Sequence, residues 1–173
     1  MSVWLLGSSG YSAQLAARLG LPFAFAAHCN PRDAVSALRP YRRRLTPSEA
    51  LAEPYALVSF TVAASDDARE ARRQAGTLAH AMLRMSQRES YLLPSPEEVA
   101  TYTYDTEERR AVDDWLTHVP YGTPEQVTAH LNQVQRDSDA DELMIGSVGH
   151  SLRARLRSTE LIADAYGMPD NPH

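Results

Sequence analysis

Four continuous apolar runs recur along the chain, and helix-like patterns separate them. The runs cover residues 3–6, 21–27 (LPFAFAA), 55–64 (YALVSFTVAA) and 142–148 (ELMIGSV). Unbroken apolar runs, as opposed to alternating ones, are typical of strands that are covered on both faces. Strands that alternate with helices predict an α/β fold with a parallel sheet and right-handed crossovers.

Capping residues mark the first predicted helices. Gly20 closes a short helix over residues 12–19. Asn30 followed by Pro31 gives a cap and a first-turn proline for the next helix, which Pro40 is expected to break or kink.

Later helices are predicted from capping boxes and apolar faces. Thr46 and Glu49 form a capping box that predicts a short helix over 46–53. A longer helix is expected over 66–88, a further one begins at 123–126 with a second cap and proline, and the last covers about 151–166. Residues 90–105 have no clear period and are interpreted as a loop. The expected core positions of the helices over 66–88 and 151–166 are Ala71, Ala75, Leu78, Met82, Met85, Leu152, Leu156, Leu161 and Ile162.

Composition limits the class of protein. The 173 residues are 43% hydrophobic and 23% charged, with a net charge of −5, which is ordinary for one globular domain over 1–173 and unlike a nucleic-acid binder. A basic cluster at residues 39–44 is interpreted as a solvated helix face in preference to a phosphate-backbone footprint. The single cysteine, Cys29, fits a reducing cytoplasm. No leader-like segment and no run of the roughly 20 residues of a membrane helix is present.

The first strand–helix junction is the main candidate for a binding site. Its residues are Gly7, Ser8, Ser9, Gly10, Tyr11 and Ser12, here called the glycine–serine turn. It follows the carboxyl end of a predicted parallel strand, where ligands bind in such sheets. Glycines allow close backbone approach, and the free N–H groups of a helix start favour an anion. The turn is neither a dinucleotide GxGxxG loop nor a Walker A loop, so a phosphate site and a plain tight turn both remain open.

Other residues are weaker candidates for a functional site. His28 follows the second strand, where it either forms part of an active-site rim or is a partly buried histidine with a backbone partner. The neighbouring Cys29 is expected to be a small buried group. Carboxylates at Asp139, Asp141 and Glu142 precede a strand, which is the stability end of a parallel barrel, and are interpreted as structural. No metal-ligand spacing is visible, and no confident catalytic acid or base emerges. His80, His118, His130 and His173 are interpreted as surface or interface residues.

Five segments together resemble the second half of the bacterial luciferase-like flavin monooxygenases. They are residues 4–28, 38–71, 121–131 (YGTPEQVTAHL), 141–145 (DELMI) and 156–166 (LRSTELIADAY), in the family's order. The resemblance covers nearly all of residues 3–167. It implies the last four βα units of a (β/α)₈ barrel, and it favours the phosphate interpretation of the glycine–serine turn, with reduced FMN or a deazaflavin as cofactor. Ser8, Ser9 and Ser12 are then the expected phosphate donors, while Tyr11 either joins them or packs on a neighbouring helix.

The resemblance also implies that half a barrel is absent, either through truncation or because this is a true half-barrel protein. Four parallel strands alone would leave open edges and an apolar face rich in Leu, Phe and Val, which favours pairing with a second copy or with a separate first half. Three functional hypotheses follow. The chain is a flavin-dependent monooxygenase acting on an organic small molecule, or its cofactor-holding half. It is a non-catalytic flavin- or phosphate-binding module. It is a gene fragment that never acts alone.

Overall fold

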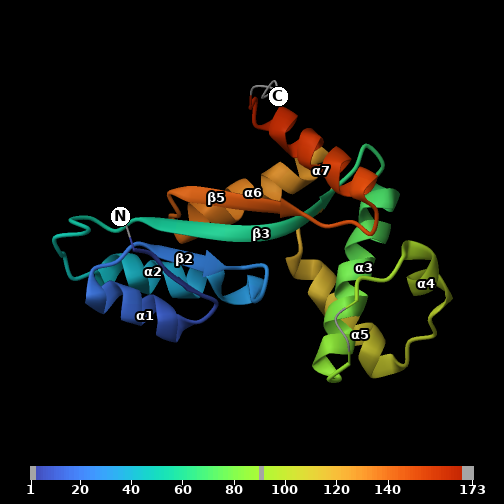
Figure 1. The fold of residues 1–173 in the computed structure, drawn as a ribbon, viewed down its shortest axis with the longest axis horizontal. Helices are drawn as coiled ribbons and strands as arrows, with labels where there is room; N and C mark the ends of the chain where they lie inside the picture. The colour runs from blue at the N-terminus through green and yellow to red at the C-terminus, as the bar shows by residue number, and fades with distance from the viewer. Residues whose placement is uncertain (1–2, 90–91, 169–173) are drawn as a thin grey trace. The chain divides into compact units, whose positions relative to one another are not determined.

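The computed structural model describes residues 3–89 and 92–168, and its strands alternate with helices along the chain (Figure 1). Contacts divide the chain into two compact units. Unit 1 comprises Met1–Phe60 and His130–Ile145, and unit 2 comprises Thr61–Ala129 and Gly146–His173. Strands β3 and β5 and helix α6 each contribute residues to both units.

The strands and helices have the following bounds. The strands are β1 Leu5–Gly7, β2 Phe23–Ala26, β3 Ala56–Ala64, β4 Tyr121–Gly122 and β5 Glu142–Ser147. The helices are α1 Gly10–Leu19, α2 Ala34–Arg44, α3 Ala68–Ser86, α4 Pro96–Thr101, α5 Thr106–His118, α6 Pro124–Ser138 and α7 Leu152–Ala165, with a 3₁₀ turn at Pro31–Asp33 before α2.

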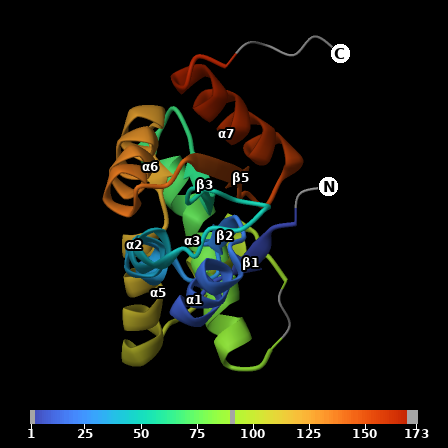
Figure 2. The ribbon, with the colours of Figure 1, turned by 90° about the vertical axis from the view of Figure 1, so that its left-hand side faces the viewer.

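The sheet of unit 1 is parallel. Leu5 of β1 lies opposite Phe23 of β2, and Phe23 lies opposite Ala56 of β3. Strand β5 also pairs with β3, so β1 and β5 are the outer strands. Helices α1 and α2 pack against each other beside this sheet (Figure 2). The predicted α/β class with parallel strands is confirmed.

Aromatic side chains fill the core of unit 1. Phe23, Phe25 and Tyr41 are fully buried, and the rings of Phe23 and Tyr41 lie 5.6 Å apart. The Tyr41 hydroxyl is 3.0 Å from the carbonyl oxygens of both Leu21 and Tyr55, the residues that lead toward β2 and β3. Burial raises the pKa of Tyr41, so the hydroxyl stays protonated and can donate. One side chain therefore ties together the starts of two strands.

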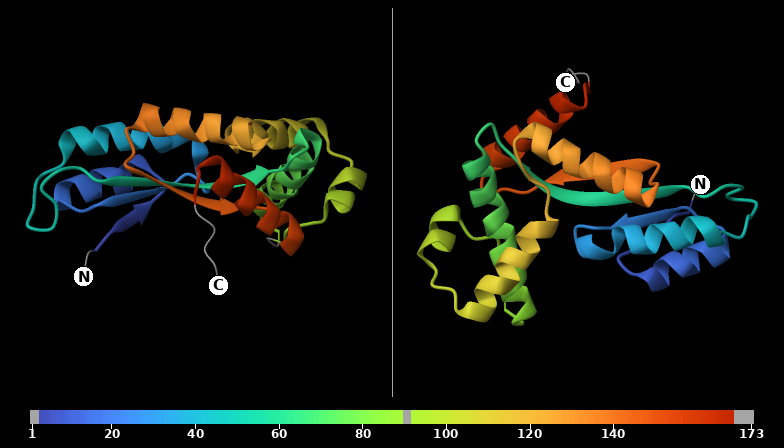
Figure 3. Two further views of the ribbon diagram at one scale, coloured as in Figure 1. Left: turned by 90° about the horizontal axis from the view of Figure 1, so that it is seen from above. Right: turned by 180° about the vertical axis from the view of Figure 1, so that it is seen from behind.

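Unit 2 is built around helix α3, which packs against α4, α5 and β4 (Figure 3). Its buried apolar cluster joins Ala75, Leu78 and Leu83 of α3 to Val112 and Leu116 of α5. The end of β3 pairs in parallel with β4. In the part of the chain that the structure describes, no helix has the length and apolar character to cross a membrane.

The predicted helix over residues 46–53 is absent, and the break that was one of the two outcomes expected at Pro40 does not occur. Residues 46–53 form no helix, because Ser48 turns the chain: its hydroxyl donates to Gly20 O at 2.8 Å and accepts from the N–H groups of Ala50 and Leu51. Pro40 does not break α2, which continues to Arg44. The helix loses one backbone donor there but gains burial of Leu38 and Tyr41 on either side of the proline.

Other predictions missed elements or misplaced core positions. Residues 90–105 contain helix α4, while Ser90 and Tyr91 lie outside the described residues. Helix α5 and the short β4 were not expected at all. Capping boxes, formed by Ser95 with Glu98 and by Asp105 with Glu108, are the local signals that could have revealed α4 and α5.

The helix faces predicted to be apolar are only partly buried. Ala71, Ala75 and Leu78 of α3 are buried, as expected, whereas Met85 is exposed. In α7, Leu161 and Ile162 are buried, but Leu152 and Leu156 are more than half exposed. The amino-terminal half of α7 thus presents its apolar residues to solvent in this chain.

Candidate functional site

The glycine–serine turn joins the carboxyl end of β1 to the first turn of α1. Gly7 is the last residue of β1, Ser9 is the N-cap, and Gly10 is the first helical residue. Ser9 has an extended backbone, with φ −141° and ψ 159°, as an N-cap requires. All of these residues lie in unit 1 and are exposed or half-buried.

A capping box fixes the shape of the turn. The Ser12 hydroxyl donates to Ser9 O at 2.8 Å, and the Ser9 hydroxyl accepts from Ser12 N at 3.4 Å. The Ser9 N–H in turn points at the Ser12 hydroxyl oxygen. These bonds satisfy several of the polar groups that a helix start leaves without partners.

Gly7 is required by close approach, whereas Gly10 is not. A Cβ atom at Gly7 would lie 2.1 Å from Ser12 Oγ and 2.4 Å from Ser12 Cβ, far inside van der Waals contact. A Cβ at Gly10 would meet nothing within 4 Å. The Ser12 side chain therefore occupies the space that any side chain at position 7 would need.

Several hydrogen-bond donors of the turn have no acceptor within the described residues. In the part of the chain that the structure describes, the Ser8 hydroxyl makes no hydrogen bond, and helix geometry leaves the N–H groups of Gly10 and Tyr11 without intrahelical acceptors. Tyr11 is 72% exposed, which argues against the alternative that it packs on a neighbouring helix of this chain. A hydroxyl and two backbone N–H groups at a helix start form an arrangement suited to an anion.

His28 lies just beyond β2 and is held from β3. Its ring Nδ1 is 2.9 Å from the hydroxyl of buried Ser59, and its own N–H donates to Ser59 O. The Ser59 hydroxyl is also 3.3 Å from Phe25 O. The His28 side chain is exposed and anchored through one nitrogen, while the neighbouring Cys29 is exposed and not buried as expected.

Asn30 is a positioning residue that the sequence did not reveal. It was predicted to cap the following helix, but its side chain makes no capping bond. Instead its Nδ2 group donates to Ser8 O at 3.0 Å and to Asp33 Oδ2 at 2.8 Å. Asn30 thereby links the loop after β2 to the middle of the glycine–serine turn, 22 residues earlier.

Carboxylates at the opposite end of the strands are structural, as predicted. Arg42 pairs with Asp139 at 2.9 Å and with Asp141 at 2.7 Å. Asp141 also accepts from the N–H of Ala56, the first residue of β3, at 2.7 Å. Tyr55 donates to the Glu142 carboxylate. These residues, here called the amino-end cluster, pair the starts of β3 and β5 with α2 of unit 1.

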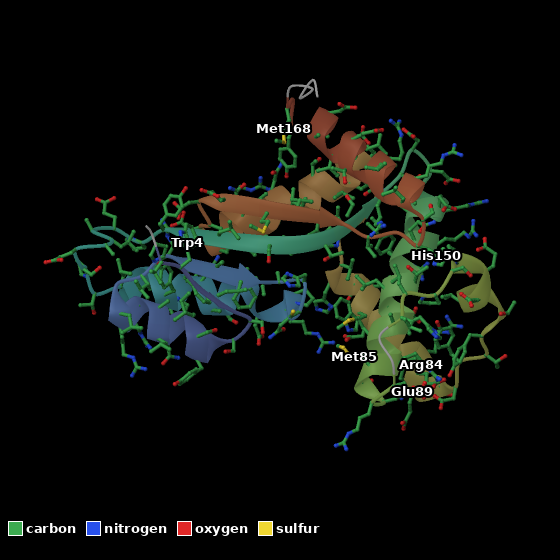
Figure 4. The ribbon with its side chains drawn as sticks, viewed as in Figure 1. Trp4, Arg84, Met85, Glu89, His150 and Met168 are labelled. Atoms are coloured by element: carbon green, nitrogen blue, oxygen red, sulfur yellow. The ribbon has the colours of Figure 1, made fainter. Side chains whose placement is uncertain are left out.

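Two arginines of the basic cluster on α2 have partners in or near the amino-end cluster. Arg42 belongs to it, and the Arg39 side chain donates to Asp137 O. Both contacts support the prediction of a helix face over a phosphate footprint. Tyr55 of the amino-end cluster also meets the Trp4 ring edge-on at 5.7 Å (Trp4 is labelled in Figure 4).

The remaining histidines have structural partners. His80 is half-buried: it meets the Tyr102 ring edge-on at 4.7 Å, and its Nδ1 is 2.8 Å from Tyr104 Oη. His130 meets Phe60 edge-on. The His150 N–H donates to Gln74 Oε1 at 3.2 Å, and its ring Nδ1 lies 3.3 Å from Leu93 O (His150 is labelled in Figure 4). His173 lies outside the described residues. Within residues 3–89 and 92–168, no group of three or more His, Cys, Asp or Glu side chains is arranged to hold a metal ion.

The fold and the site together define an α/β protein of βα-barrel type, with leftover donors at the carboxyl end of its first strand. The sequence model of the luciferase-like monooxygenase family matches residues 2–140. The chain belongs to this family, and the predicted family resemblance is confirmed.

Curated relatives agree with this assignment. Uncharacterized protein YvbT of Bacillus subtilis is 40% identical over 164 residues, which are 95% of this chain and 49% of YvbT. A luciferase-like monooxygenase of Escherichia coli K12 is 39% identical over 162 residues, which are 94% of this chain and 48% of that protein. The chain thus spans about half the length of the curated relatives that it matches.

Solved structures show the same half-length match. The crystal structure of apo-MsnO8 superimposes with a TM-score of 0.80 and 30% identity, covering 98% of this chain and 52% of MsnO8. The oxygenating constituent of 3,6-diketocamphane monooxygenase from Pseudomonas putida, solved with FMN, gives a TM-score of 0.63 at 18% identity, over 95% of this chain and 47% of that one. The second likeness concerns the fold alone. The chain therefore has the fold of about half of a (β/α)₈ barrel of the luciferase-like type.

Proposed function

We propose that this chain is the cofactor-holding half of a flavin-dependent monooxygenase, and that the glycine–serine turn binds the phosphate of reduced FMN. Membership of the luciferase-like family supports the reaction class. The observation that carries the phosphate site is the set of leftover donors at the turn: the Ser8 hydroxyl and the N–H groups of Gly10 and Tyr11.

The residues of the turn fit a phosphate group by their chemistry. Hydrogen bonds from hydroxyl and backbone N–H donors to an anion are stronger than those between neutral groups. The partial positive charge of the α1 amino terminus acts in the same direction, and no acidic residue lies in the first turn of α1. A dianionic phosphate would therefore meet donors and no repulsion from this turn.

The three serines of the turn have different roles at such a site. Ser8 donates directly, since its hydroxyl is uncommitted as it lies here. Ser9 and Ser12 hold the turn in shape through the capping box, and their hydroxyls reach the phosphate only by exchanging those bonds. Asn30 fixes the Ser8 main chain, so Ser8 N–H and hydroxyl keep one orientation.

The cofactor supplies the oxygen chemistry when it is bound, and this chain orients it. The phosphate tail is held at the turn, and His28 on the neighbouring strand end presents an exposed imidazole that Ser59 keeps in place. Relatives of this fold include an F420-dependent secondary alcohol dehydrogenase, similar at 12% identity and a TM-score of 0.58. A deazaflavin is accordingly the alternative cofactor, because a phosphate turn serves both. The substrate is an organic small molecule, and the free cysteine favours the cytoplasm as the place of action.

The proposal includes a partner for the open sheet of unit 1. Val3, Leu6 and Met144 are 63%, 66% and 57% exposed, and β1 pairs only with β2 among the described strands. The phenylalanines Phe23 and Phe25, in contrast, are buried, so the expected Phe-rich exposed face is not found. An apolar surface beside an open edge favours association, either with a second copy or with a chain that supplies the other half. The second candidate function, a flavin-binding module without turnover, rests on the same half-length match.

A titration with FMN and with riboflavin tests the phosphate site. The two ligands differ only by the phosphate, so their affinity ratio reports the turn directly. We expect Ser8→Ala to weaken FMN about ten-fold and riboflavin hardly at all, because one charge-assisted hydrogen bond is lost. Ser86→Ala is the matched control: Ser86 is a serine of unit 2 whose hydroxyl donates to Leu83 O within its own helix, outside the network of the turn.

Other results would contradict parts of the proposal. Equal affinity for FMN and riboflavin in a folded protein would show that the turn does not bind the phosphate. Oxygen-dependent turnover with reduced FMN would separate an enzyme from a binding module. Size-exclusion chromatography with light scattering tests the partner, and a well-folded monomer at high concentration would count against it.

A further inference from the structure

Unit 2 contains a cavity that lies outside the turn proposed for the flavin phosphate. Residues of α3, α4, α5 and the segment between α4 and α5 line a partly open cavity with a volume of about 400 Å³. Small-molecule sites typically have volumes of ~300–1,000 Å³. The cavity is therefore large enough for a small ligand.

The cavity walls combine apolar surface with tyrosine rings. Val99 of α4 and Val112 and Leu116 of α5 contribute apolar side chains. Tyr102 and Tyr104 follow α4, and their rings are 4.7 Å apart in an edge-on arrangement. Such walls suit the apolar or aromatic body of a ligand.

Positive charge predominates in the lining. The charged lining residues are Arg69, Arg72, Arg73, Arg109 and Asp113. Four guanidinium groups thus face one carboxylate. Clefts with one predominant sign of charge attract ligands of the opposite sign.

Two of the arginines are already paired, and two are not. Arg73 pairs with Glu70 at 2.8 Å and with Glu97 at 2.7 Å. Arg72 donates to the Tyr121 hydroxyl and lies 3.8 Å from Asp113.

The unpaired arginines are the ones available to a ligand. Among residues 3–89 and 92–168, neither Arg69 nor Arg109 forms an ion pair with a carboxylate. The Arg109 guanidinium lies 4.3 Å from the centroid of the Tyr104 ring, which holds it by a cation–π contact. A guanidinium fixed in this way matches a carboxylate with two parallel N–H donors.

Gly76 contributes to the open space of the cavity. It lies inside helix α3, where glycine costs about 0.5–1 kcal/mol relative to alanine. Its φ is not in the left-handed region, and an added Cβ would meet nothing within 4 Å. Neither backbone conformation nor packing requires glycine at this position. Because Gly76 lines the cavity, its missing side chain enlarges the space for a ligand.

We propose that the cavity between α3, α4 and α5 binds a small organic acid, with its apolar body against the tyrosines and valines and its carboxylate on Arg109 and Arg69. The proposal rests on unit 2 alone and holds whether or not the glycine–serine turn binds a flavin phosphate.

Binding of 4-phenylbutyrate to the full chain tests this proposal, with 4-phenylbutanol as the neutral counterpart. Calorimetric titration at low salt is expected to show binding of the acid at least ten-fold tighter than that of the alcohol. Arg109→Gln is expected to weaken the acid about ten-fold, the effect of losing a hydrogen bond to a charged group. Arg110→Gln, the adjacent arginine of α5 that does not line the cavity, is the matched control and is expected to change affinity less than two-fold.

Two further variants separate the cavity from other causes. Gly76→Leu places a side chain in the cavity and is expected to abolish binding, while thermal unfolding shows a helix at least as stable as before. Ser8→Ala is expected to leave binding of the acid unchanged. The proposal is overturned if 4-phenylbutyrate does not bind, if the alcohol binds equally well, or if Arg109→Gln and Gly76→Leu bind like the unmodified protein.

Discussion

At the starts of β3 and β5, the polar groups of the amino-end cluster are hydrogen-bonded or ion-paired. At the end of β1, in contrast, the glycine–serine turn has hydrogen-bond donors without acceptors among the described residues. Asp141, for example, accepts hydrogen bonds both from Arg42 and from the Ala56 N–H. Ser8, in contrast, offers a hydroxyl with no acceptor among the described residues. Both regions lie in unit 1, the cluster at the amino ends of β3 and β5 and the turn at the carboxyl end of β1.

This difference separates stability from binding. Paired ions and filled hydrogen bonds at the strand starts lower the energy of the folded chain, and nothing remains there for a ligand to satisfy. Unfilled donors at a strand end add little stability, but they give an anion something to bind. The division matches the general behaviour of parallel barrels, whose amino-terminal face stabilises and whose carboxyl-terminal face binds.

The largest expected effect is that of Gly7→Ala, which would distort the glycine–serine turn and so make a binding region as important for stability as the amino-end cluster. The new Cβ would overlap Ser12 Cβ, a main-chain-anchored atom that cannot swing away. We expect a loss of about 3 kcal/mol in the free energy of unfolding, measured by urea denaturation. Gly10→Ala is the control and is expected to be neutral or slightly stabilising, because its Cβ meets open space. Equal losses for the two variants would contradict the close-approach argument.

Asp141→Ala is expected to cost about 2 kcal/mol, since it leaves the buried Ala56 N–H unsatisfied and removes one partner of Arg42. The Asp141 side chain is only 28% exposed, so water cannot fully replace it. Asp137→Ala, whose carboxylate lies 3.9 Å from Arg39 at the surface, is the matched control and is expected to cost less than about 0.5 kcal/mol. Flavin affinity should be unchanged in both, which sharpens the division between the two ends.

Asn30→Ala is expected to act in the opposite way, with a small change in stability and a loss of about three- to ten-fold in FMN affinity. Its amide fixes Ser8 O, so its loss disorders the phosphate donors without opening the core. Riboflavin affinity is the internal control, because a positioning role at the phosphate leaves it unaltered. A parallel loss of riboflavin binding would show that Asn30 supports the fold and not the phosphate site.

His80→Gln is expected to have the smallest effect. It removes the contribution of His80 to the pH dependence of stability, which would otherwise overlap with pH effects measured at the turn or at the amino-end cluster. Burial, followed by the charge of Arg84, lowers the pKa of His80. The unfolded chain therefore binds the proton more readily, so this contribution to stability is complete above about pH 6.5 and is lost as the pH falls below it. The variant should flatten the pH dependence of the unfolding free energy in that range. An unaltered slope would show that His80 stays solvated.

Local pattern was enough for much of the fold. Strands β2 and β3, helix α1 with its Gly20 cap, and the long helix α3 lie where apolar runs and capping residues predicted them. These elements are set by side chains close in sequence and by burial on both faces of a sheet. The same reasoning missed α5 because its charged surface hides the two buried residues, Val112 and Leu116.

What the sequence by itself determined is the α/β class, the family and the position of the glycine–serine turn at a strand end. Tertiary structure alone decided that Ser12 fills the space beside Gly7, that Asn30 reaches back to Ser8, and that Ser48 makes a turn where a capping box predicted a helix. The physical reason is common to these three cases. A hydrogen bond or steric contact between distant residues depends on where the folded chain brings them, and a helical or strand period carries no information about that.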